Sequence, residues 1–159
     1  MAIEIERKYL VLNDEYKRNA QRTLYRQGYI SVDLQRVVRV RITGDRAFLT
    51  IKSLVSETTR LEFEYDIPVS DAAELLDKLC TKPIIEKYRY ELTVDDQLWI
   101  VDEFLGDNAG LVVAEIELES EDQPFTKPSW AGTEVSADPR YLNARLAIEP
   151  FKFWNKKSK

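Results

Sequence analysis

The sequence predicts a mainly antiparallel β protein of about eight strands with a few helices. Apolar and polar residues alternate with a period of two along most of the chain, which is typical of strands. Short turn signals at 43–45 and 95–96 join successive strands, so these neighbours are expected to be antiparallel. No repeat or linker divides the 159 residues. We therefore expect a single domain over residues 1–150, followed by a flexible tail over residues 151–159.

The expected strands follow directly from this alternation. They span residues 2–11, 22–31, 35–43, 46–52, 58–67, 84–94, 97–104 and 111–119. The clearest helix lies between residues 67 and 83, where Ser70 is a suitable cap and leucines recur at helical spacing. A second helix is expected near residues 14–21. A third begins at Asp138, because Pro139 suits a first helical turn, and runs to Leu146.

The composition excludes several classes of chemistry. The chain has 23 Lys+Arg, 28 Asp+Glu and no histidine, for a net charge of −5. Catalytic triads and histidine metal sites are thereby excluded, so a catalytic metal would have carboxylate ligands. A single cysteine, Cys80, excludes an intramolecular disulfide and indicates a cytoplasmic location. The short apolar runs and the acidic balance indicate neither a membrane nor a nucleic-acid partner.

Like charges gather on one face of each predicted strand, because residues two apart share a face. The acidic residues of these faces are Glu4, Glu6, Glu62, Glu64, Glu115 and Glu117, and the basic residues are Lys8, Arg39, Arg41, Lys52, Lys87 and Arg89. Two like charges roughly 6.5 Å apart repel by about 2.5 kcal/mol at an effective dielectric constant of 20. Such segregation indicates counter-ions, namely divalent cations for the acids and an anion for the bases.

Two architectures are compatible with these faces. In an antiparallel sandwich, the charged faces would point to solvent. In an eight-stranded closed tunnel barrel, they would line a charged lumen, with the helices on the outside covering the apolar face. A lumen with both charge sets suits a phosphate chain carried with a hard cation, Mg²⁺ or Mn²⁺.

The order of the charged residues resembles that of the CYTH superfamily, the triphosphate tunnel metalloenzymes. Glu4-Ile5-Glu6-Arg7-Lys8 is similar to the Glu-x-Glu-x-Lys signature that opens members of this family. The remaining matching residues follow in order: Gln27-Gly28-Tyr29, Arg39 and Arg41, Lys52, Glu62 and Glu64, Lys87 and Arg89, Asp102, then Glu115 and Glu117. The resemblance covers residues 2–148, and it implies an antiparallel tunnel that binds a linear triphosphate with Mg²⁺ or Mn²⁺.

The resemblance also implies residue roles, carried over position by position. Binding of the triphosphate is assigned to Lys8, Tyr29, Arg39, Arg41, Lys52, Lys87 and Arg89. Metal binding is assigned to Glu4, Glu6, Glu62, Glu64, Asp102, Glu115 and Glu117. The catalytic set is expected to comprise Glu4, Glu6, Lys8, Lys52 and Glu64.

The favoured activity is metal-dependent hydrolysis of inorganic triphosphate to pyrophosphate and phosphate, because the compact chain resembles the small bacterial members of the family. One alternative is a class IV-type adenylyl cyclase that converts ATP to cyclic AMP and pyrophosphate. Another is a polyphosphate-binding module without catalysis. In each case the partner is a small-molecule phosphate compound, and the protein is expected to be a monomer or homodimer.

Overall fold

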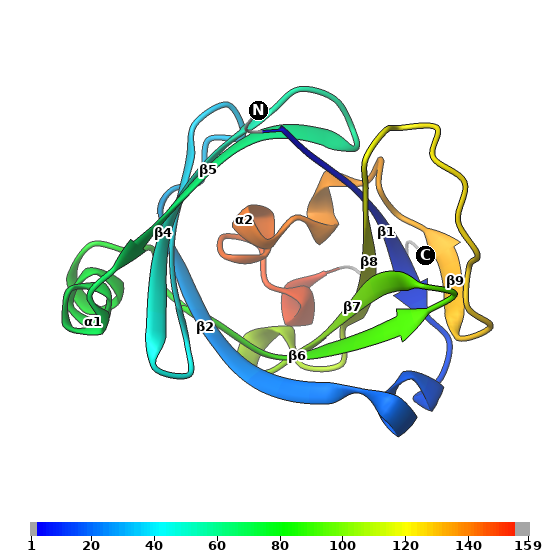
Figure 1. Ribbon diagram of the computed structural model, residues 1–159. Coiled ribbons are helices and arrows are strands. Elements are labelled where there is room, and N and C mark those ends of the chain that lie inside the picture. The colour runs from blue at the N-terminus through cyan, green and yellow to red at the C-terminus, as the bar shows by residue number, and fades with distance from the viewer. Residues whose placement is uncertain (1–2, 155–159) are drawn as a thin grey trace.

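Eight antiparallel strands close into a barrel in the computed structural model, which describes residues 3–154. The strands are β1 (Ile3–Val11), β2 (Gln21–Ser31), β3 (Val37–Thr43), β4 (Arg46–Leu54), β5 (Thr59–Ile67), β6 (Ile85–Val94), β7 (Gln97–Phe104) and β8 (Val112–Leu118). Their order around the barrel is β1-β5-β4-β3-β2-β6-β7-β8, and β8 pairs with β1 again (Figure 1). The predicted mainly antiparallel, eight-stranded closed barrel is confirmed.

Strand β1 closes the barrel by pairing with different strands along its length. Its first residues pair with β5, where Glu4 lies opposite Arg60. Its last residues pair on the same edge with β9 (Ala131–Glu134), a four-residue strand that the sequence pattern did not indicate. The other edge of β1 pairs with β8. This closure excludes the sandwich, because the charged faces of the strands now lie around a common interior.

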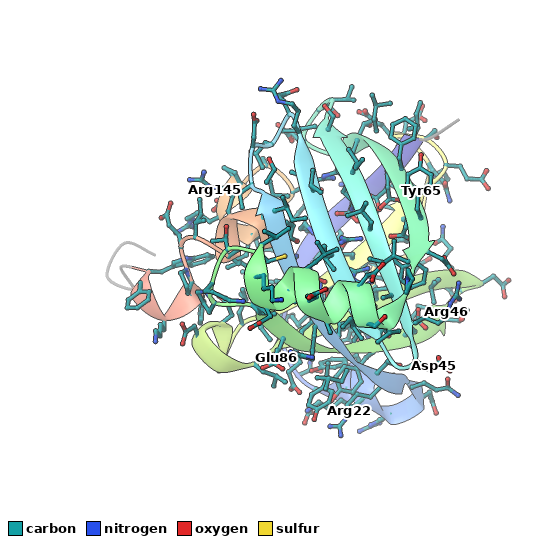
Figure 2. The ribbon with its side chains drawn as sticks, turned by 90° about the vertical axis from the view of Figure 1, so that its left-hand side faces the viewer. Arg22, Asp45, Arg46, Tyr65, Glu86 and Arg145 are labelled. Atoms are coloured by element: carbon teal, nitrogen blue, oxygen red, sulfur yellow. The ribbon has the colours of Figure 1, made fainter. Side chains whose placement is uncertain are left out.

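Helix α1 (Val69–Lys78) covers β3 and β4 on the outside of the barrel (Figure 2). It buries Leu76 and, at its end, Cys80 against Val40 and Ala47. A Cβ on Gly28 of β2 would lie 2.8 Å from the Cβ of Cys80, so glycine allows this close approach. The helix begins directly after Pro68, whose backbone is extended, and the predicted cap Ser70 instead lies within the first turn.

A second outer core is aromatic. It contains Tyr9 of β1 and Trp99 of β7, which pack against Tyr16 and against Trp130 directly before β9. The Trp99 and Trp130 rings meet edge to face, with their centroids 5.7 Å apart. Tyr16 belongs to η1 (Glu15–Asn19), a 3₁₀ helix at the place where the second helix was predicted. These aromatic groups therefore serve packing and lie away from the charged interior.

The predicted C-terminal helix is divided in two and differs in position from the expectation. After η3 (Pro139–Tyr141), helix α2 (Asn143–Leu146) lies within the ring of strands when the barrel is viewed from its end (Figure 1). Its apolar residues Ala144 and Leu146 pack against inward-facing Tyr29 and other apolar side chains of the barrel. The helix thus helps to fill the interior instead of covering the outside, because its apolar residues match the apolar side chains at this end.

The C-terminal residues continue this inner packing. A 3₁₀ helix, η4 (Phe151–Phe153), follows, and Phe151 and Trp154 pack against the same cluster as α2. The backbone N–H of Phe151 donates to Asn108 in η2 (Gly106–Asn108) at 2.8 Å. The described packing therefore includes residues 151–154 of the expected tail, and residues 155–159 lie outside the described residues.

Helices cover only part of the outer surface. The apolar side chains of Ile51, Leu61, Phe63 and Tyr65 on β4 and β5 are exposed, and Tyr65 lies clear of α1 in Figure 2. In the part of the chain that the structure describes, no helix combines the length and the apolar character that a membrane crossing requires.

Replacement of Leu76 tests the packing of α1. Leu76 is 1% exposed and Leu79, one turn later, is 62% exposed. Leu76→Ala should lower the free energy of unfolding by about 2–5 kcal/mol, since it leaves a cavity beneath the helix. Leu79→Ala should change it by less than about 0.5 kcal/mol. Urea unfolding followed by circular dichroism measures both, and equal losses would contradict the assigned packing.

Candidate active site

A cavity of about 230 Å³ lies inside the barrel. Its charged lining comprises seven basic side chains, Lys8, Arg39, Arg41, Lys52, Arg60, Lys87 and Arg89, and six carboxylates, Glu4, Glu6, Glu62, Glu64, Glu115 and Glu117. Tyr29 also lines it. Apart from Asp102, the structure brings every predicted site residue to this one cavity.

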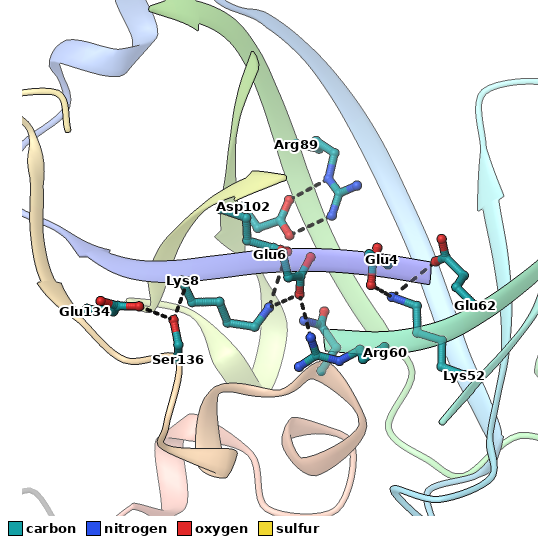
Figure 3. Close-up of polar contacts among 12 residues, drawn as sticks. Glu4, Glu6, Lys8, Lys52, Arg60, Glu62, Arg89, Asp102, Glu134 and Ser136 are labelled. Carbon is teal, nitrogen blue, oxygen red and sulfur yellow. Dashed lines mark hydrogen bonds and ion pairs between the residues drawn. The ribbon is translucent and has the colours of Figure 1, made fainter. Parts of the chain in front are cut away.

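Two lysines bridge carboxylates from different strands (Figure 3). The Nζ of Lys8 lies 3.2 Å from Oε1 of Glu6 and 3.4 Å from Oε2 of Glu115. The Nζ of Lys52 lies 3.0 Å from Oε1 of Glu4 and 3.3 Å from Oε2 of Glu62. Burial opposes the charge of Lys8, but the nearby carboxylates outweigh it and raise the pKa of this lysine. The two lysines therefore neutralise part of the negative charge that the glutamates of β1, β5 and β8 bring into the cavity.

The acidic strands nevertheless hold more negative charge than the lysines balance. Glu6 of β1 lies directly opposite Glu117 of β8 in the sheet. Partial burial, together with the charges of Glu4 and Glu6, raises the pKa of Glu117. No ion pair of Glu117 within 4.0 Å occurs among residues 3–154. This side of the cavity therefore favours binding of a further cation.

Asp102 lies behind the basic side of the cavity and differs in placement from the other predicted metal ligands. It is 1% exposed and is absent from the cavity lining. Its Oδ2 accepts from the Nζ of Lys87 at 2.8 Å and from Nη2 of Arg89 at 3.0 Å, while Oδ1 accepts from Nε of Arg89 at 2.9 Å. Both carboxylate oxygens are thus occupied by the two cations that they orient.

Asp102 and Glu64 do not neutralise all the cations on this side, because in the described part of the chain Glu64 pairs only with Arg39, whose Nη2 lies 3.3 Å from Oε2. Burial, with the nearby Arg39 and Arg89, lowers the pKa of Arg41 to about 9. Burial also lowers the pKa of Lys87 well below its usual value, although Asp102 acts in the opposite direction. The Nε of Arg39 is buried without a hydrogen-bond partner among the described residues. This basic side therefore favours binding of an anion.

Uncharged side chains hold several of these cations in place. Gln27 accepts from Nε of Arg41 at 2.9 Å, and its Nε2 donates to Tyr29 Oη at 2.9 Å and Asn143 Oδ1 at 3.2 Å. The same Asn143 oxygen accepts from the Nζ of Lys87 at 2.9 Å. Helix α2 thus contacts the basic residues directly. Sequence reasoning missed Asn143, because no local pattern indicates a contact with a strand 56 residues away.

Tyr25 provides a second support for the basic side. Its ring centroid lies 4.8 Å from Cζ of Arg41 and 4.7 Å from Cζ of Arg89. Such distances allow cation–π attraction to both guanidinium groups. The aromatic ring therefore holds two arginines that would otherwise repel each other.

The carboxylates suit a hard divalent cation by their chemistry, because Mg²⁺ and Mn²⁺ prefer oxygen ligands. The excess negative charge around Glu117 supports the same assignment. Within residues 3–154, no three of these carboxylates converge tightly enough to form a ready cluster. Lys8 and Lys52 instead lie between them, so a metal would compete with ammonium groups for the same oxygens.

Arg60 also lines the cavity and was missing from the predicted set. It is 7% exposed and lies on β5, two residues before Glu62. The period of two that placed Glu62 and Glu64 on the inner face places Arg60 there as well. The sequence therefore carried a signal for Arg60, although on this strand the family resemblance includes only Glu62 and Glu64.

Comparison with protein families identifies the fold. The CYTH domain matches residues 2–144. The chain belongs to the CYTH family. A protein of Acetivibrio thermocellus named inorganic triphosphatase is 52% identical over 96% of this chain and 97% of its own length. An inorganic triphosphatase of Nitrosomonas europaea is 36% identical over 91% of this chain and 97% of its own length.

A solved structure supports the same fold. A crystal structure of an inorganic triphosphatase superimposes with a TM-score of 0.67 and 35% identity, covering 93% of this chain and 96% of the other. The family resemblance read from the charged residues is thereby confirmed.

Removal of Asp102 tests the buried ion cluster. Asp102→Ala leaves Lys87 and Arg89 without their shared carboxylate, so it should lower the free energy of unfolding by about 3–5 kcal/mol. Glu134→Ala is the control, because its pair with Arg7 is one-third exposed and should be worth less than about 1 kcal/mol. Urea unfolding measures both losses, and a small loss for Asp102→Ala would contradict the assigned role.

Proposed function

We propose that this protein hydrolyses inorganic triphosphate to pyrophosphate and phosphate with the help of Mg²⁺ or Mn²⁺. The observation that carries the proposal is the pair of opposed, incompletely balanced charge sets in one cavity. A triphosphate carrying a divalent cation would satisfy both sets. The two relatives named inorganic triphosphatase support the same activity.

The basic residues bind and orient the phosphate chain in this proposal. They are Lys8, Arg39, Arg41, Lys52, Lys87 and Arg89, and Tyr29 lies beside them on the wall. Arginine presents a planar fork that matches two phosphate oxygens, whereas lysine acts as a point charge. Asp102 is a positioning residue, because its oxygens hold Lys87 and Arg89 and it is absent from the cavity lining.

The carboxylates hold the metal. The proposed ligand set is Glu4, Glu6, Glu62, Glu64, Glu115 and Glu117. A divalent cation bound there supplies positive charge that neutralises the phosphate chain as it reacts. Lys8 and Lys52 contact these carboxylates and line the cavity, and they would exchange carboxylate oxygens for phosphate oxygens when the substrate binds.

The chemical step is attack of water on a terminal phosphorus, in line with the bond that breaks. Positioning and charge stabilisation by the surrounding cations supply most of the rate. The carboxylates of Glu64, Glu115 and Glu117 are the candidates to accept the proton of the attacking water. Glu4, Glu6, Lys8, Lys52 and Glu64 form the proposed catalytic set.

The cyclase and binding-module alternatives have less support. Both curated relatives are named as triphosphatases, and each covers nearly the whole chain. A cyclase would release pyrophosphate and a cyclic nucleotide from ATP, and a binding module would bind polyphosphate without turnover.

Phosphate release from inorganic triphosphate, ATP and pyrophosphate tests the proposal, each with Mg²⁺, Mn²⁺ or a chelator. We expect turnover of inorganic triphosphate that the chelator abolishes. The double variant Glu4→Gln/Glu6→Gln should lose at least about 100-fold in kcat/KM, because two oxygen ligands lose their charge. Glu119→Gln, directly after the end of β8 and outside the cavity lining, should retain activity.

Three results would contradict the proposal. These are cyclic AMP production from ATP without hydrolysis of inorganic triphosphate, binding without turnover on any triphosphate, and full activity in the double variant.

A further inference from the structure

Arg60 is a buried cation without a satisfactory partner. Its side chain is 8% exposed and lies on the cavity wall, opposite Glu4 in the pairing of β1 with β5. Its nearest carboxylate oxygen, Oε1 of Glu6, is 3.6 Å from Nη1, which is longer than a hydrogen bond. Among residues 3–154, Nη1 has no hydrogen-bond partner. Figure 3 shows this guanidinium beside the Glu6–Lys8 pair.

Arg89 differs from Arg60 in this respect. Nε and Nη2 of Arg89 both donate to Asp102, at 2.9 and 3.0 Å, so this guanidinium is satisfied. Nη1 of Arg60 must share the Glu6 oxygen with Lys8, whose Nζ is closer to it, at 3.2 Å. A buried donor without a partner is costly, and a ligand oxygen in the cavity would relieve this cost.

The side chains of Arg60 and Lys8 also approach the same carboxylate. Both contact Oε1 of Glu6, so their nitrogen atoms converge on a single negatively charged oxygen. If Glu6 turns toward a divalent cation, these two cations lose that oxygen together. Lys8 would keep Glu115, 3.4 Å from its Nζ, whereas Arg60 would have no other carboxylate within 4.0 Å among residues 3–154. A phosphate oxygen placed between the two cations would give Arg60 a partner and Lys8 a second one.

We propose that Arg60 is a further phosphate-binding residue, which takes an oxygen of the triphosphate next to the one held by Lys8. The inference rests on the proposed function and adds a seventh cation to the substrate site. The guanidinium fork contributes two donors in fixed geometry, so its role is to fix one phosphate group in addition to supplying charge.

Another role for Arg60 would be to balance the charge of Glu4 and Glu6. The two roles predict different measurements. A phosphate ligand acts on the affinity for triphosphate even without metal. A charge-balancing residue acts on the carboxylates, so its removal would change the concentration of Mn²⁺ needed for half-maximal turnover and leave metal-free binding of triphosphate unchanged.

Calorimetric titration with inorganic triphosphate in the presence of a chelator distinguishes them. Arg60→Gln should weaken metal-free binding about 10- to 100-fold, the loss expected for a charge-assisted hydrogen bond. Arg26→Gln is the matched control, since it removes one positive charge from an exposed pair with Glu86 on the outer face of β2 and β6. This control should bind as tightly as the unchanged protein.

Arg60→Lys keeps the charge but loses the fork, and it provides the test if Arg60→Gln does not fold. We expect it to bind triphosphate several-fold more weakly, with an unchanged requirement for Mn²⁺. Unchanged metal-free binding in the folded Arg60 variants would overturn this inference while leaving the proposed function intact. If the unchanged protein neither bound nor hydrolysed inorganic triphosphate, the proposed function would fail, and this inference with it.

Discussion

The pairing of β1 with β5 closes the barrel, and the charged cavity depends on this closure. Without it, the charged faces of eight strands would point to solvent, where water and salt would weaken their repulsion. With it, seven cations and six carboxylates surround a cavity of about 230 Å³. Charges interact more strongly in such an enclosed space, so each one needs a partner or a ligand.

The protein meets this need only in part. Lys8 and Lys52 bridge carboxylates between strands, and Asp102 holds Lys87 and Arg89. These contacts allow the barrel to fold around its charges. The remaining imbalance, positive around Arg41 and negative around Glu117, is what gives the cavity its capacity to bind an anion together with a cation. Stability and function therefore depend on the same incomplete pairing.

Much of the fold and site follows from the alternation of side chains along strands. This rule placed Glu4 and Glu6, or Arg39 and Arg41, on one face without knowledge of the barrel. The same rule applied to β5 includes Arg60, which was overlooked because it stands outside the recognised motif.

Other features depend on contacts between distant segments, so no local pattern predicts them. Four-residue β9 exists because β1 extends past the end of β5 and offers a free edge. Asn143 reaches Lys87 only because α2 enters the barrel. Asp102 matches the family motif, but its absence from the cavity lining follows from its contacts with Lys87 and Arg89, which the sequence alone does not reveal.

A crystal structure of the protein soaked with inorganic triphosphate and Mn²⁺ tests the central claim most directly. The account predicts the phosphate chain inside the barrel, in contact with Arg39 and Arg41, and anomalous scattering from Mn²⁺ beside the carboxylates of Glu4 and Glu6. A triphosphate bound only on the outer surface, with the cavity free of both phosphate and Mn²⁺, would contradict it.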